Sequence, residues 1–133
     1  MIQYFAAYFF TAATFLSLDL IWLGFVAKDF YFNRIGDLLA QPFNIPAAVI
    51  FYLLYIVGIM IFAMHPALSA GSWRTALILG GLFGFFCYAT YDMTNLATLK
   101  DWSVSLVIVD IIWGTLLTAS ATTVGYLLTK LFF

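Results

Sequence analysis

Residues 74–98 read RTALILGGLFGFFCYATYDMTNLAT. A helix needs about 20 mostly apolar residues to cross a membrane, and this run is long enough. Every fourth residue of this run falls on one face of the helix and forms a stripe: Ala76, Gly80, Gly84, Tyr88 and Asp92. Small residues on one face let membrane helices approach closely. We therefore predict a membrane-spanning helix whose stripe, and with it Asp92, points into a helix bundle.

Three more apolar runs lie at about residues 2–27, 46–64 and 103–131. The first has no positive leading segment and no small-residue cleavage site, so we interpret it as a retained span and not a signal peptide. His65-Pro66 is expected to end the second. The 133 residues are 65% hydrophobic and only 8% charged, whereas a soluble domain carries about a quarter charged residues. We predict an all-α fold: a single transmembrane domain over residues 1–133, built as an integral membrane four-helix up-down bundle with tight turns.

The first connection is longer than the others and predicts an amphipathic interfacial helix over about residues 29–41. Its polar side has strict four-residue spacing: Asp29, Asn33, Asp37 and Gln41. The apolar side holds Phe32, Ile35, Leu38 and Leu39. Two interpretations stay open, a surface connector and a lid over a site at that end of the bundle.

Three aspartates lie inside the predicted spans, and the chain contains no glutamate: Asp19 in SLDLIWLG, Asp92 in YDMTN and Asp110 in VDIIWG. Each costs roughly 2.5–3.5 kcal/mol at the centre of an inserting helix. Their offsets from the predicted span ends place all three carboxyls ~9–12 Å below the same membrane face at about 1.5 Å per residue. We therefore predict one shared site, with the three aspartates as its catalytic groups.

Other side chains near that depth are candidates for binding a substrate: Trp22, Tyr88, Asn95, Trp113, Tyr52 and Tyr55. Each has a structural alternative. The tyrosines of the second run serve bundle packing or donate phenolic hydrogen bonds to a carboxylate. Trp22 and Trp113 serve the interface or line a ligand cavity, while Trp73 and Trp102 are expected in the interfacial aromatic belt.

Three carboxyls close together in a low dielectric cannot all stay ionised, so at least one is expected to hold a proton. Such a cluster suits general acid–base work on a substrate dissolved in the bilayer. It equally suits carrying a proton or binding a hard cation through oxygen. The predicted site lacks histidine, so soft metals are not expected there. No cofactor is identified, and a net charge of −1 without basic clusters excludes a nucleic-acid surface.

The three aspartate motifs, in DLIWLG, YDMTNLATL and VDIIWG, resemble the bacterial membrane family called domain of unknown function 2177. The resemblance covers essentially the whole chain. It implies a four-helix integral membrane protein of the bacterial inner membrane and implies no activity.

Three functions are compatible with these residues. The first is a small enzyme or binding protein acting on a membrane lipid or other hydrophobic substrate. The second is a proton- or cation-coupled transporter or channel, which would require a homodimer because four spans seldom enclose a pathway alone. The third is a structural or accessory subunit. The positive-inside rule favours both termini outside the cytoplasm. The first and third connections hold Lys28, Arg34 and Lys100, whereas the other side of the membrane holds Arg74 and Lys130.

Overall fold

The structure is a computed structural model that describes residues 1–133, and its regular elements are all helical. Their bounds, in chain order, are α1 Ile2–Ile21, the π-helical turn η1 Trp22–Val26, α2 Lys28–Ile35, the 3₁₀ turn η2 Gly36–Leu38, α3 Ile45–Ile59, the π-helical turn η3 Met60–Met64, α4 His65–Ala70, α5 Trp73–Thr98 and α6 Val104–Phe132.

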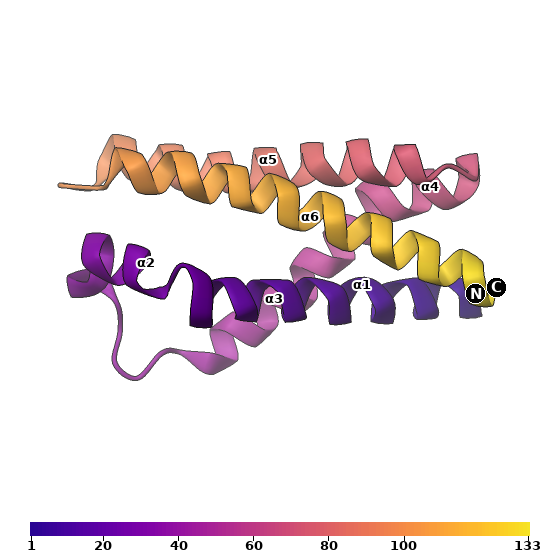
Figure 1. The fold of residues 1–133 in the computed structure, drawn as a ribbon, viewed down its shortest axis with the longest axis horizontal. Coiled ribbons are helices and arrows are strands. Elements are labelled where there is room, and N and C mark those ends of the chain that lie inside the picture. Colours follow the sequence, from indigo (N-terminus) through magenta and orange to yellow (C-terminus); the bar gives the residue numbers. More distant parts are fainter.

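Four of the resulting rods are long and apolar enough to cross a membrane: Ile2–Val26, Ile45–Ala70, Trp73–Thr98 and Val104–Phe132. This confirms the predicted all-α membrane fold. Helices α1, α5 and α6 run along the length of the molecule, while the second span crosses them obliquely (Figure 1). The chain ends lie together at one end of the bundle, and α2 lies at the other (Figure 1).

The prediction that His65-Pro66 ends the second span is wrong, because the helix continues through α4 to Ala70. Proline lacks an N–H and its ring clashes with the carbonyl four residues back. Here the π-helical turn η3 precedes it, and His65 donates its N–H to the Met60 carbonyl, five residues back. The extra residue in that turn accommodates the ring. The span ends instead at Gly71, which adopts the left-handed conformation with φ of 63°.

The connector helix is shorter than predicted and turned differently. It ends at Ile35, a 3₁₀ turn follows to Leu38, and residues 39–44 form no helix. Phe32 and Leu38 of the predicted apolar side are exposed. The side that packs on the bundle carries Phe30 and Tyr31 together with Ile35 of the predicted side, and these residues contact a buried cluster of Trp102, Leu106 and Val107. Aromatic rings such as these two bury a large apolar surface.

The predicted stripe of α5 packs against α6. Ala76, Gly80, Gly84 and Asp92 are its buried residues. A Cβ atom built on Gly84 would lie 2.4 Å from the carbonyl oxygen of Gly114, and one on Gly80 would lie 2.6 Å from Thr122 Oγ1. Only glycine permits such close approach of two backbones.

Threonines inside the spans satisfy their own hydroxyls. Eight of them donate to the carbonyl four residues earlier in the same helix: Thr14, Thr90, Thr94, Thr98, Thr115, Thr122, Thr123 and Thr129. This local bond lets a helix carry a hydroxyl in an apolar setting without a partner from another helix.

Candidate functional site

A cavity of about 320 Å³ lies at the α2 end of the bundle. Polar and aromatic side chains from α1, α2, α3, α5 and α6 meet on its walls, among them Asp19, Tyr31, Tyr52, Tyr88, Asp110 and Trp113. We call it the polar cavity. Two of the three predicted catalytic aspartates therefore line one space, although they lie on the first and last spans.

Asp19 has a hydrogen-bond donor on each of its carboxyl oxygens. It is 5% exposed. Tyr52 Oη donates to Oδ2 over 2.6 Å, and Trp113 Nε1 donates to Oδ1 over 3.1 Å. The two donors come from α3 and α6, so this aspartate ties three spans together. Hydrogen bonds of this kind are the strong ones when the acceptor is ionised.

Asp110 is held from the connector helix. Tyr31 Oη donates to Asp110 Oδ1 over 2.7 Å, and Trp22 Nε1 donates to the same phenolic oxygen over 3.2 Å. Burial raises the pKa of Tyr31 above its ordinary value, and the nearby charge of Asp110 raises it further. The phenol therefore stays protonated and remains a donor.

Two stacked indoles join these two carboxyl sites. The rings of Trp22 and Trp113 lie 4.3 Å apart at an angle of 10°. Trp22 supports the phenol that binds Asp110, and Trp113 binds Asp19 directly. A displacement of either ring would therefore change the hydrogen bonds of both carboxyls.

Asp92 is entirely buried and has no donor on either oxygen. Asp110, on the facing helix α6, is its carboxyl neighbour. Two ionised carboxylates cannot bond to each other, because each offers only acceptors. A hydrogen bond between Asp92 and Asp110 would therefore require a proton on one of them. Asp19 and Asp110 line the polar cavity, whereas Asp92 does not.

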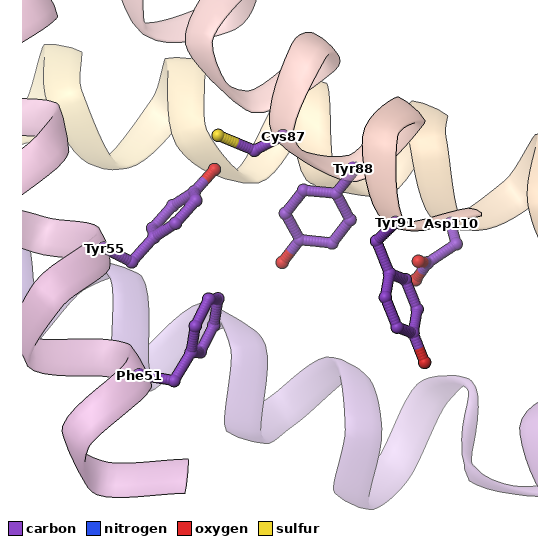
Figure 2. Close-up of a pocket in the computed structure, with 6 residues that line it drawn as sticks. All are labelled: Phe51, Tyr55, Cys87, Tyr88, Tyr91 and Asp110. Carbon is purple, nitrogen blue, oxygen red and sulfur yellow. The ribbon is translucent and has the colours of Figure 1, made fainter. Parts of the chain in front are cut away.

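A second cavity of about 430 Å³ lies beside the first, and five of its six lining residues are hydrophobic. Phe51 and Tyr55 of α3 face Cys87, Tyr88 and Tyr91 of α5 across it, with Asp110 at one end (Figure 2). We call it the apolar slot. It shares Tyr88, Tyr91 and Asp110 with the polar cavity. Every residue from 41 to 51 is exposed, so the first turns of α3 stand off the bundle on this side.

The other predicted binding residues are placed unevenly. Tyr55 lines the apolar slot while its hydroxyl pairs with Thr118 Oγ1 at 2.9 Å. Trp22 supports Tyr31 and lines neither cavity. Asn95 is half-buried and also lines neither, because it lies a turn beyond the cavity walls on α5. Trp102, expected in the interfacial belt, is instead 8% exposed and lines the polar cavity.

Sequence reasoning missed Tyr31 and Tyr91. Tyr31 belongs to neither face of the regular pattern drawn over residues 29–41, although it stands beside Phe30 in an aromatic pair that a short polar connector does not need. Tyr91 directly precedes Asp92, and a helix turns by about 100° per residue. Its ring therefore flanks the buried stripe and reaches the cavities from the side.

The chemistry available here is that of oxygen acceptors, phenolic donors and protons. No group of three or more histidine, cysteine, aspartate or glutamate side chains is arranged to hold a metal ion. Asp19 and Asp110 can accept hydrogen bonds from a polar group, and the Asp92–Asp110 pair can hold or release a proton.

Residues 4–127 match the family described as a predicted membrane protein, domain of unknown function 2177, and the chain belongs to that family. This confirms the family resemblance of the aspartate motifs. No curated protein and no solved structure matches the chain.

Proposed function

We propose that this member of the family binds an amphiphilic molecule from the lipid phase, with its polar end in the polar cavity and its hydrocarbon part in the apolar slot. The chain is then a lipid-binding protein or a small membrane enzyme that uses carboxyl acid–base chemistry. We also propose the bacterial inner membrane as its location, in line with the family resemblance.

The observation that carries this proposal is the meeting of two unlike cavities at Tyr88, Tyr91 and Asp110. Binding sites for small molecules combine apolar walls with a few placed polar groups. Here the apolar walls and the carboxyls form neighbouring compartments. An amphiphile has the same two parts, a polar end and a hydrocarbon chain. The slot lies between α3 and α5 in the membrane-spanning part of the bundle, so a lipid tail can enter from the side.

In this proposal the three carboxyls have different tasks. Asp110 borders both compartments and contacts the polar group of the substrate. Asp92 stands behind it and exchanges a proton with it, as an acid–base pair does. Asp19 orients the opposite wall through Tyr52 and Trp113.

The transporter hypothesis gains one argument and meets one obstacle. The Asp92–Asp110 pair is suited to carrying a proton. Beyond the cavities, however, Gly80 and Gly84 bring α5 against α6 so closely that an added Cβ would clash. A pathway through one copy cannot run between these two helices, and four spans seldom enclose a pathway alone, so transport would need a second copy of the chain. We place it second.

Mass spectrometry of the lipids that co-purify with the full chain tests the proposal. We expect D110N to lose the retained amphiphile. We expect C87F to lose it as well, because the added ring fills the slot while all three carboxyls stay in the sequence. D37N changes an exposed aspartate of the connector and serves as the matched control, with retention like the unchanged protein. Equal lipid content in all four proteins would overturn the proposal and favour the purely structural role of the aspartates.

A further inference from the structure

We infer that the polar end bound in this cavity is a cationic amine, so that the ligand is a lipophilic amine and not an anionic lipid. The inference rests on the proposed function and adds the chemical class of its substrate. It follows from the charges and the aromatic walls of the site, and from the few donors that Asp92 and Asp110 have.

The cavities contain carboxyls and no countercharge. Asp19 and Asp110 line the polar cavity, and no lysine, arginine or histidine lines either compartment. The nearest candidate, Arg34, is turned away. It donates to Ser105 Oγ and to the carbonyl of Phe30, and its guanidinium lies 3.7 Å from the centre of the Phe30 ring. Ionisable groups inside a membrane normally have a partner, and here the protein supplies no cation.

Aromatic rings complete a cation-binding environment. Tyr31, Tyr52, Tyr88 and Trp113 line the polar cavity together with the two carboxyls. The faces of such rings attract ammonium groups, most strongly when water is excluded. A phosphate or carboxylate head group would instead lie beside two carboxyls, and like charges placed together are unfavourable.

Two of the carboxyls have few donors of their own. Both oxygens of Asp92 are unbonded although the side chain is 0% exposed, and its carboxyl neighbour Asp110 has only one identified donor, Tyr31. A primary ammonium brings three N–H donors and a positive charge to such acceptors. It can bind Asp110 from the cavity side and leave the proton shared with Asp92 to complete the set. A hydroxyl brings one donor and no charge, so it satisfies the site less well.

The test compares three probes with one tail: octadecylamine, octadecanol and octadecyl phosphate. Each is titrated into the purified full chain in detergent, and tryptophan fluorescence reports binding, since Trp102 and Trp113 line the polar cavity. We expect the amine to bind about tenfold more tightly than the alcohol, a difference of about 1.4 kcal/mol, and the phosphate to bind most weakly. In D110N the preference for the amine over the alcohol should disappear.

The outcomes separate the two proposals. If the phosphate binds as tightly as the amine, and C87F weakens both, the amine inference is overturned while lipid binding in the slot stands. If none of the three probes responds to C87F or D110N, the proposed function itself fails. A preference for the amine that persists unchanged in D110N would also overturn the inference, because the charge would then lie elsewhere.

Discussion

The contact between helices α5 and α6 has two halves, and the two halves are built differently. In one half, Gly80 and Gly84 lie against Thr118 and Thr122 with no room for a Cβ atom. In the other half, the stripe continues into Tyr88 and Asp92, and Tyr88 and Asp110 line both cavities. One sequence pattern with a four-residue period therefore forms a close helix contact first and then reaches the wall of a cavity.

The difference teaches how a small bundle can keep an unfilled site. Membrane helices gain no hydrophobic driving force from each other, so close van der Waals contact must hold them. The glycine half supplies that contact and fixes the spacing of α5 and α6. The carboxyl half also packs closely at Tyr88, whose ring lies against Gly114. The bonds of its carboxyls to Tyr31, Tyr52 and Trp113 set the shape of the site.

The largest effect is expected from breaking the close half with G84A. The new Cβ would lie 2.4 Å from the Gly114 carbonyl oxygen, and a backbone atom cannot yield unless the helices separate. We expect a loss of about 3 kcal/mol in the free energy of unfolding, measured by denaturing titration in mixed micelles. G24A is the control, since a Cβ there has nothing within 4 Å. Equal losses in both variants would show that the close contact does not hold the bundle.

A smaller effect is expected in the open half from Y52F, which removes the donor to Asp19 Oδ2. Interhelical hydrogen bonds in membranes contribute about 1–2 kcal/mol, and we expect a loss in that range by the same titration. Y8F is the matched control, because the Tyr8 hydroxyl donates to the Leu53 carbonyl at an exposed position. If Y8F lowers the free energy of unfolding as much as Y52F does, the hydrogen bond to Asp19 contributes no more to stability than a bond at an exposed position.

D92N is expected to stabilise the protein or leave its stability unchanged, in contrast to the two losses above. The amide can donate to Asp110 without taking up a proton, so the buried acceptor gains a permanent donor. We expect thermal stability in detergent to hold or to rise by about 1 kcal/mol. A clear fall in the melting temperature would mean that Asp92 has a donor of its own and is not paired with Asp110.

The smallest effect concerns pH and Tyr31. Its pKa is raised in the folded protein by burial and by Asp110, so the folded state keeps a proton that the unfolded state releases above about pH 10. The stabilisation by this bond is complete below that pH and is lost as the pH rises further. The difference in melting temperature between the unchanged protein and Y31F should therefore shrink from pH 9 to pH 11. A constant difference would contradict the shift.

The sequence predicted the close half better than the open half. The four-residue spacing of Gly80 and Gly84 in a membrane helix mainly serves close helix packing. The buried stripe could therefore be predicted from it, and the structure confirms both the stripe and the four spans. The end of the second span was wrong because Pro66 is a helix breaker only when the preceding turn is regular, and the π-helical turn η3 depends on packing.

The open half depends on contacts between distant elements. That Asp19 and Asp110 would line one cavity followed from equal depth on antiparallel helices. The part played by Tyr31 did not, because a side chain on a connector can reach the bundle only once the rotation of α2 is known. Asn95 was a candidate on helical spacing alone, and one further turn carries it past the cavity walls.

The hydrogen bonds of the threonines and of Asp19 have different consequences for biosynthesis. Each of the eight threonine hydroxyls finds its acceptor four residues earlier, within the segment that enters the membrane with it. Asp19 is synthesised 33 residues before Tyr52 and 94 residues before Trp113. Asp19 is therefore synthesised before either of its donors; the second span brings the first donor, Tyr52, and α6 brings the last, Trp113. The order of translation makes α6 the element that completes both the bundle and the site.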